Sequence, residues 1–202
     1  MNTRSQEVPR LRERLREETA RAILAAAERV FGEEGLHAAR MERIAAAAGV
    51  AVGTLYNHFA DREALVEALC RDGREALLAR VDAAVAAAQG RPAAEQLRAF
   101  LEGVRDHARA RGPFLAVLAQ SGEGPARARP PATLNAELTR RAEAIVRRGV
   151  RAGELRPDGH GVHAVAFLGI TRALVVRTLE RQGSWDGFVD AALDAFLRGA
   201  GR

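Results

Sequence analysis

Lysine is absent from this chain of 202 residues, so all 31 basic side chains are arginines. Cysteine occurs once, at Cys70, which excludes an internal disulfide. Aromatic residues make up only 4% of the chain, and no apolar run approaches the ~18 residues that a membrane-spanning helix requires. These absences lead us to expect a cytoplasmic protein without a membrane segment.

Signatures of catalysis and of metal or cofactor binding are also missing. The three serines have no recognisable nucleophile context, there is no phosphate-binding loop, and Cys70 has no histidine partner evident in the sequence. His160 and His163 have the i, i+3 spacing of a helical metal pair, but no cysteine or acidic cluster completes it. We therefore expect neither an enzyme nor a protein with a bound cofactor or metal.

The net charge of +5 is distributed unevenly along the chain. Residues 1–80 contain 13 arginines and 13 acidic residues, whereas residues 81–202 contain 18 arginines and 13 acidic residues. The basic excess therefore lies in the C-terminal part. Net charge alone does not predict nucleic-acid binding by the N-terminal part, where individual arginines would have to supply phosphate contacts.

Helical periodicity runs through most of the chain, and glycine and proline separate the periodic segments. With 48% hydrophobic residues, the chain can bury a substantial core. Beyond residue 60 we predict helices over about 62–89, 93–110, 132–152, 160–182 and 185–198. No strand pattern appears, so the predicted fold is all-α.

The most informative segment is IAAAAGVAVGTLYNHF, which spans residues 44–59. It predicts two short helices joined by a tight turn at Gly49, a residue well suited to end a helix in a left-handed conformation. On the second helix Val52, Leu55, Tyr56 and Phe59 share one apolar stripe, which we expect to dock on the rest of the domain.

The opposite face of that second helix holds Gly53, Thr54, Asn57 and His58, all small or hydrogen-bonding and none carrying a fixed charge. Asparagine can pair with adenine through two hydrogen bonds, threonine can meet an acceptor or a thymine methyl group, and glycine permits close approach of the backbone. This face predicts a recognition helix for the DNA major groove. An ordinary solvated helix face is the alternative.

Two earlier helices complete a compact domain. The first has an apolar stripe of Ile23, Ala27, Val30 and Phe31 and ends near Gly35, and the second carries apolar residues at helical spacing, Met41, Ile44, Ala45 and Ala48. Three helices with a turn of about four residues between the last two form a helix-turn-helix domain.

Residues 21–69 resemble the N-terminal domain of the TetR family of bacterial transcriptional regulators. The matching features are Ile23, Ala26, Ala27, Phe31, Gly35, Ile44-Ala45, Ala48-Gly49-Val50, Gly53-Thr54-Leu55-Tyr56, Phe59 and Leu65. The rest of the chain has a length typical of the family but no comparably specific motif.

The resemblance implies a set of DNA-binding residues: Arg40, Gly53, Thr54, Tyr56, Asn57, His58 and Arg62. Tyr56 would pack with its ring and reach a phosphate with its hydroxyl group. Arg62 stands where the family often has a phosphate-binding lysine. Arg40 replaces a threonine or serine that caps a helix in the family. Because arginine cannot cap, Arg40 either contacts a phosphate or is simply solvated.

The resemblance also implies a homodimer that binds palindromic double-stranded DNA. Two apolar helices near the C-terminus would form the interface through Val165, Leu168, Gly169, Val176, Phe188, Val189, Ala192, Leu193 and Phe196. Packing of these residues inside one subunit is the alternative.

An effector pocket is the third implication. Its predicted lining is Phe100, Val104, His107, Phe114, Leu118, Phe167, Ile170 and Arg172. Most of these are ordinary core residues, and the effector is a small molecule of unknown identity. Arg172 interrupts an apolar stripe, so it would bind an anionic effector, or extend to solvent, or form an ion pair at an interface.

The predicted organisation is an N-terminal arm or extension over residues 1–20, a helix-turn-helix DNA-binding domain over 21–66, and a larger helical effector-binding and dimerisation domain over 67–202. The predicted function is a sequence-specific transcriptional regulator, a repressor whose operator affinity a small molecule modulates. The alternative is a DNA-binding architectural or protein-interaction protein that responds to no small molecule.

Overall fold

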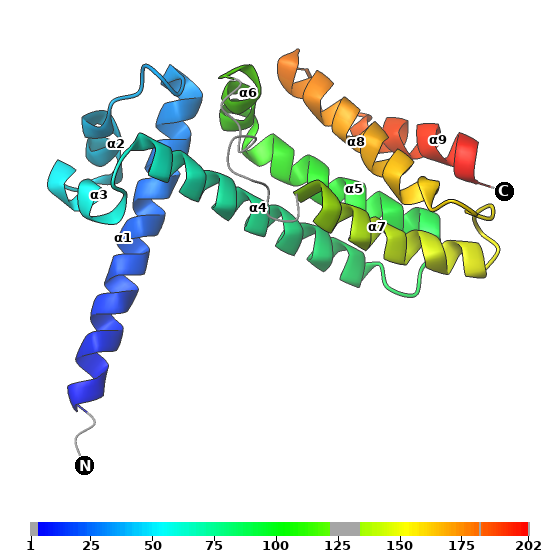
Figure 1. Cartoon of the computed structure of the whole chain (residues 1–202), viewed down its shortest axis with the longest axis horizontal. Coiled ribbons are helices and arrows are strands. Elements are labelled where there is room, and N and C mark those ends of the chain that lie inside the picture. Colours follow the sequence, from blue (N-terminus) through cyan, green and yellow to red (C-terminus); the bar gives the residue numbers. More distant parts are fainter. Residues whose placement is uncertain (1–3, 122–133, 182, 202) are drawn as a thin grey trace. The chain divides into compact units, whose positions relative to one another are not determined.

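The computed structural model describes the backbone of the chain except residues 1–3, 122–133, 182 and 202 (Figure 1). The side chains of residues 4–10 and 120–121 are also not described. Within the described ranges the secondary structure is α-helical, as predicted. The helices are α1 (Arg4–Glu34), α2 (Met41–Ala48), α3 (Val52–His58), α4 (Arg62–Ala87), α5 (Ala93–Ala110), α6 (Gly112–Ser121), α7 (Leu134–Arg151), α8 (Val162–Glu180) and α9 (Phe188–Ala200).

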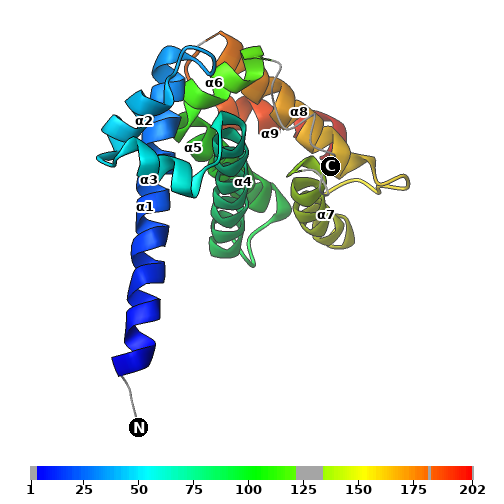
Figure 2. The ribbon, with the colours of Figure 1, turned by 60° about the vertical axis from the view of Figure 1, so that its left-hand side comes forward.

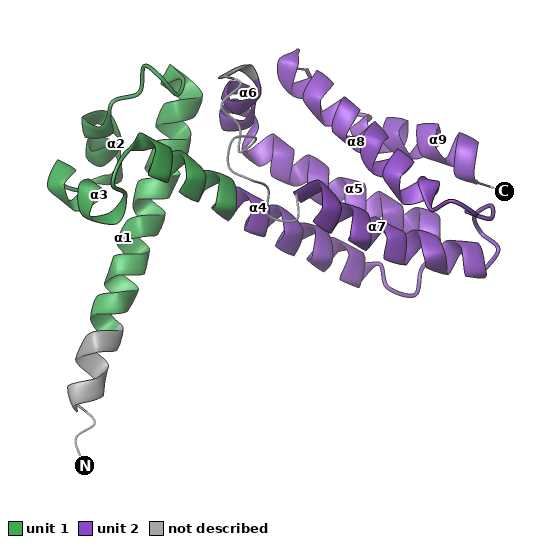
Figure 3. Cartoon of the chain, viewed as in Figure 1, with its two compact units in different colours: residues 1–71 green, residues 72–202 purple. Residues whose placement is uncertain are grey.

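The chain divides into two compact units, residues 1–71 and residues 72–202 (Figure 3). Helix α4 begins in unit 1 and continues into unit 2. The predicted N-terminal arm or extension over residues 1–20 is, from Arg4 on, the first part of α1, which runs without interruption to Glu34. Residues 11–18 of this helix are exposed, including Leu11 and Leu15 at 59% and 54%.

Unit 1 is built on the predicted stripes. Ile23, Ala27, Val30 and Phe31 of α1 are at most 1% exposed, and Ile44 and Ala45 of α2 are fully buried. Gly49 ends α2 with φ 70°, and the following Val50 N–H donates to the Ala45 carbonyl at 3.0 Å. This left-handed turn satisfies the last carbonyls of α2 and redirects the chain into α3.

In unit 2, helices α7, α8 and α9 pack with α5 around a core of aliphatic and aromatic residues (Figure 2). Phe167 lies between Phe100 and Phe196, with ring centroids 5.4 Å and 5.3 Å away and edge-to-face geometry. Gly149 lets α7 approach α5 closely, because a Cβ atom there would lie 2.6 Å from the Cβ atom of Ala93. Close packing of this kind favours a single arrangement of the helices.

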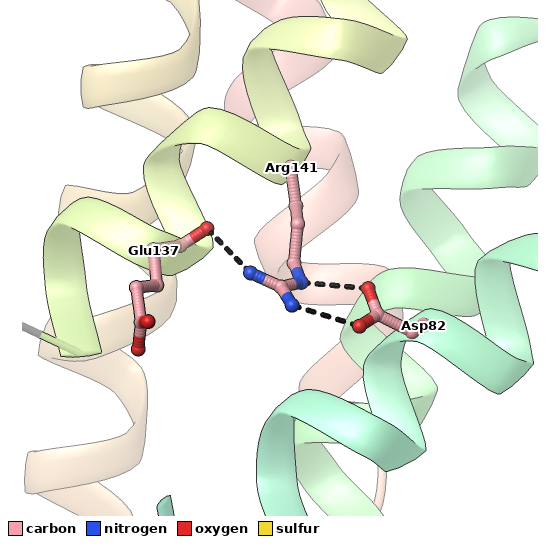
Figure 4. Close-up of polar contacts among 3 residues, drawn as sticks. All are labelled: Asp82, Glu137 and Arg141. Atoms are coloured by element: carbon pink, nitrogen blue, oxygen red, sulfur yellow. Dashed lines mark hydrogen bonds and ion pairs between the residues drawn. The ribbon is translucent and has the colours of Figure 1, made fainter. Parts of the chain in front are cut away.

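Ion pairs join helices of unit 2 at its surface. Arg141 of α7 donates from Nε and Nη2 to the two carboxylate oxygens of Asp82 on α4, at 2.6 Å and 2.8 Å, and from Nη1 to the Glu137 carbonyl at 3.1 Å (Figure 4). The two parallel bonds fix the direction of the guanidinium group. Arg98 of α5 similarly contacts Asp190 of α9 at 2.7 Å.

Helix α8 is long and apolar enough, by length and composition alone, to cross a membrane. This differs from the expectation that no apolar run of the chain approaches the length of a membrane-spanning helix. Core helices of soluble proteins meet the same criterion, and one side of α8 packs into the core through Ala164, Phe167 and Leu168. The apolar residues of α8 therefore lie on two faces of the helix, one buried in the core and one exposed.

Candidate nucleic-acid interface

The recognition-helix residues predicted from sequence lie on the surface of unit 1, on α3. Gly53 and Asn57 are exposed and Thr54 and His58 are half-buried, while Leu55 is fully buried and anchors the helix. A Cβ atom on Gly53 would meet no atom of the chain within 4 Å. Nothing inside the fold requires glycine at this position, so its small size leaves room for a molecule outside the chain.

Tyr56 differs from the prediction of a docking residue, because it is 46% exposed. The docking stripe is carried mainly by Leu55, with Val52 and Phe59 half-buried beside it. A helix of only seven residues buries fewer side chains against the domain than the periodic pattern predicts. The exposed tyrosine adds a ring and a hydroxyl group to the same outer surface as Asn57.

Arg40 is the N-cap residue of α2 and has extended backbone angles, φ −96° and ψ 143°. Its exposed side chain makes no capping hydrogen bond, as expected for arginine. Two other arginines hold α2 in place. Arg43 contacts Glu34 at 3.3 Å, and Arg29 donates to the Ala47 carbonyl at 3.5 Å, a long hydrogen bond.

The side chain of Arg62, which is predicted to contact a phosphate, makes hydrogen bonds within unit 1. Its guanidinium group donates to two main-chain carbonyls of the loop between α1 and α2, from Nη1 to His37 at 3.2 Å and from Nη2 to Ala39 at 2.8 Å. Arg62 was assigned to a phosphate because of its charge and its place in the family pattern. A charge pattern does not reveal main-chain acceptors 23 and 25 residues away.

The predicted effector residues lie in unit 2 but do not surround a described hollow. Phe100, Val104, His107, Phe114 and Phe167 are at most 8% exposed, and Leu118 and Ile170 are half-buried. Arg172 is exposed, on the side of α8 that also presents Val165 and Val176, so it does not join the buried group as predicted.

Two described surface hollows of unit 2 are lined by other residues. One of about 380 Å³ is lined by Glu143, Val146, Arg147, Val150, Arg151, Asp158, Gly161 and Ala164. The other, of about 600 Å³, is lined by Asp82, Val85, Ala86, Gln89, Gly90, Arg91, Ala93, Gln96, Arg148, Gly149, Ala152 and Glu154. None of the predicted effector residues lines either hollow.

His107 has an unusual electrostatic environment between α4 and α5. Its pKa is lowered from 6.5 to about 4, chiefly because burial removes the solvation of the charged imidazolium. The positive charges of Arg111 and Arg80 contribute to this lowering, and Asp72 opposes it. Arg111 is itself 9% exposed and contacts Asp72 at 3.3 Å. His107 is therefore neutral at neutral pH.

The nine predicted dimer-interface residues separate into two groups. Leu168, Phe188, Val189, Ala192, Leu193 and Phe196 are at most 6% exposed and belong to the core of unit 2, which corrects their assignment to a subunit interface. Val165, Gly169 and Val176 are exposed on α8. Val162, which the prediction missed, extends this face and is 52% exposed. The sequence pattern did not separate the two faces because α8 is apolar on both.

Among the described residues no group of three or more histidine, cysteine, aspartate or glutamate side chains is arranged to hold a metal ion. Asp158 instead accepts hydrogen bonds from the Val162 and His163 amides at the start of α8, at 2.8 Å and 3.0 Å. These bonds lower the pKa of Asp158 in spite of the opposing effect of desolvation, the largest single contribution. Asp158 thus acts as a helix cap.

Residues 23–69 match the family described as bacterial regulatory proteins, tetR family. The transcriptional regulator UidR of Escherichia coli strain K12 is 42% identical over 62 residues, which cover 31% of this chain. The match spans about a third of the length of that relative, 32%.

Solved structures extend the likeness of the fold to both units. PfmR, a TetR-family transcriptional regulator of Thermus thermophilus, is 25% identical with a TM-score of 0.69 and matches over 88% of this chain and 97% of its own. A TetR-family structure from Mesorhizobium loti has a TM-score of 0.73 at 17% identity, over 93% and 98% of the two chains. Residues 23–69 are therefore similar to the TetR-family helix-turn-helix domain, and the fold of both units is similar to that of solved TetR-family structures.

Proposed function

We propose that this protein is a sequence-specific, DNA-binding transcriptional regulator that acts in the cytoplasm. The observation that carries the proposal is the outer face of α3, where Gly53, Tyr56 and Asn57 are exposed while Leu55 anchors the helix. A helix held in this way after a tight turn can enter a major groove and present hydrogen-bonding side chains to base edges. The family match covers this segment.

The test is selection of bound fragments from random-sequence DNA, with the full chain and with the Asn57→Ala variant. Wild type should enrich one palindromic sequence, and Asn57→Ala should relax the preference at one position of each half-site by about 1–3 kcal/mol. Asn135→Ala is the matched control, since Asn135 is an exposed asparagine of α7 in unit 2. Absence of enrichment by a folded wild type would refute the proposal.

We further propose a homodimer formed through the exposed face of α8, which contains Val162, Val165, Gly169 and Val176. Exposed valines grouped on one side of a helix are costly to leave in water and favour an interaction surface, on which Arg172 adds one positive charge. Two recognition helices separated by about one DNA turn, ~34 Å, or by a multiple of it, would read the two halves of a palindrome. Light scattering after size-exclusion chromatography should give twice the mass of one chain.

A small-molecule effector bound in unit 2 would modulate DNA affinity, with repression relieved on binding. This part of the proposal is supported by the aromatic core of Phe100, Phe167 and Phe196, which offers an apolar environment if the helices separate. By linkage, DNA would weaken effector binding by the same factor. Metabolites that raise the melting temperature in a screen should also lower affinity for the selected DNA.

A second candidate function is favoured by the tight packing of that same core. Because the predicted effector residues are mostly buried against one another, unit 2 would serve dimerisation and protein partners without binding a small molecule. Under this alternative, every compound that binds the protein would leave the affinity for the selected DNA unchanged. Titration of that DNA with and without each compound separates the two candidates.

A further inference from the structure

Arg62 is the first residue of α4, yet its side chain contacts a loop 23 to 25 residues earlier in the chain. Its two terminal nitrogens donate to the carbonyls of His37 and Ala39, at 3.2 Å and 2.8 Å. The backbone at this end of α4 is fixed independently by Asp61, whose carboxylate accepts a hydrogen bond from the Ala64 amide at 2.7 Å. The base of the Arg62 side chain is therefore held firmly.

The loop that Arg62 holds leads directly into α2. Ala39 is fully buried, and the next residue, Arg40, accepts hydrogen bonds at its carbonyl from the amides of Arg43 and Ile44, each at 3.1 Å. Arg40 itself is exposed, and its side chain makes no hydrogen bond or ion pair with any described residue. Its direction depends on the backbone that precedes it.

The two acceptors lie two residues apart and require two donors at a fixed separation. A guanidinium group provides them on one rigid plane, whereas the ammonium group of lysine is a single point on a flexible chain. Lysine would keep the positive charge of Arg62 but lose the bridge between the two carbonyls. Replacing Arg62 by lysine therefore tests the geometry of the two hydrogen bonds while the positive charge is kept.

We infer that Arg62 is a positioning residue for DNA binding: it fixes the loop of residues 37–39 so that Arg40, at the start of α2, contacts a DNA phosphate. The phosphate contact is thereby assigned to Arg40. The inference rests on the proposed DNA-binding function and adds to it separate roles for two arginines of the same domain, one that positions the loop and one that contacts the phosphate.

The test measures affinity for the DNA fragment selected by wild type, over a series of salt concentrations, for Arg62→Lys, Arg40→Gln and the double variant. Each phosphate contact contributes about 0.9 to the slope of log K against log salt concentration. Arg40→Gln should lower affinity and reduce the slope by about 1.8, because the proposed dimer loses one contact in each half-site. Arg62→Lys should do the same although the net charge is unchanged, and the double variant should be no weaker than Arg40→Gln alone.

Arg21→Lys is the matched control, because Arg21 is exposed on α1 and makes no hydrogen bond or ion pair with a described residue. It should leave affinity and slope unchanged. Hydrogen exchange of the residue 40–44 amides should be faster in Arg62→Lys than in wild type, with an unchanged circular dichroism spectrum.

Retention of both affinity and slope by Arg62→Lys would overturn the inference, since it would mean that Arg62 contacts a phosphate directly. Additive losses in the double variant would overturn it too, because the two residues would then act independently. If wild type selects no DNA at all, the proposed function fails together with the inference. The wild-type selection therefore tells the two failures apart.

Discussion

Helices α3 and α8 each bury one side and expose the other, but their exposed sides differ in chemistry. The outer face of α3 presents glycine, tyrosine and asparagine, whereas that of α8 presents valines and a glycine around a single charged residue, Arg172. The first can exchange hydrogen bonds with water for hydrogen bonds with base edges, whereas the valines of the second gain only by leaving water. The difference supports the two proposed partners, a DNA groove for unit 1 and a second subunit for unit 2.

The largest effect is expected from a charge placed on the apolar face. Val165→Glu should convert the dimer to a monomer, because each interface would bury an unpaired carboxylate. Affinity for palindromic DNA should fall by roughly 100-fold or more, since the two half-sites would no longer be bound as a linked pair. Light scattering and DNA titration measure the two effects.

Leu15→Glu is the control for this change, because Leu15 is an exposed aliphatic residue on α1 in unit 1. It should leave the mass unchanged. A dimer that survives Val165→Glu would show that α8 is not the interface and that its apolar face has another partner.

Acid should destabilise unit 2 through His107. Because folding lowers the pKa of His107 from 6.5 to about 4, the unfolded chain binds the proton more tightly. The contribution of His107 to stability is complete above pH 6.5 and is lost as the pH falls from 6.5 toward 4, up to about 3 kcal/mol. Urea unfolding at about pH 7.5 and about pH 4.5, on either side of the ordinary histidine pKa, measures this loss.

His107→Asn should reduce the difference in unfolding free energy between the two pH values, whereas His160→Asn, at an exposed position, should leave it unchanged. An equal acid sensitivity in His107→Asn and wild type would assign the effect to other groups.

Gly53→Ala should separate folding from recognition on the polar face of α3. The added methyl group meets nothing in the chain, and alanine favours a helix over glycine by up to about 1 kcal/mol, so thermal stability should hold or rise. The same methyl group would obstruct close approach to DNA, and affinity should fall by about 10-fold, or about 1.4 kcal/mol. Differential scanning calorimetry and DNA titration test both parts.

Gly112→Ala is the matched control, since a Cβ atom there also meets nothing in the chain and Gly112 lies at the start of α6 in unit 2. It should leave DNA affinity unchanged. Normal affinity in Gly53→Ala would mean that the backbone of α3 does not approach DNA closely.

The smallest effect is expected where neither exposed face is altered. Arg141→Gln removes the paired hydrogen bonds to Asp82, but Asp82 is half-exposed and water can replace its partner. The cost should stay below about 1 kcal/mol in urea unfolding, with dimer mass and DNA affinity unchanged. A larger loss would indicate that the contact between α4 and α7 is coupled to the core.

Local sequence predicted unit 1 well because its signals are local. Gly49 was expected to end α2 and does so with a left-handed backbone, and the α1 stripe from Ile23 to Phe31 is buried as predicted. Tyr56, which is 46% exposed, is one exception, and Arg62 is another, because its acceptors are main-chain carbonyls of a different segment. Such a contact leaves no pattern in neighbouring residues.

Unit 2 was predicted less well because its helices are apolar on more than one side. Periodicity indicated that α8 and α9 must be covered, but it did not indicate whether by the chain itself or by a second copy. The structure places Phe188 and Phe196 in the core of the subunit and leaves Val165 exposed. Assigning Arg172 to a pocket failed for the same reason, since the register between packed helices is a tertiary property.

The long first helix has a consequence for local stability. Residues 11–18 of α1 are exposed on every side, whereas Ile23, Ala27 and Phe31 of the same helix are fully buried. A helical segment without tertiary packing is only marginally stable in water, so its amides open individually. Brief trypsin treatment should therefore cleave after Arg12, Arg14 or Arg16 while sparing Arg29. The local stability of α1 would thus rise, turn by turn, from its exposed N-terminal part to the part that packs in the folded domain.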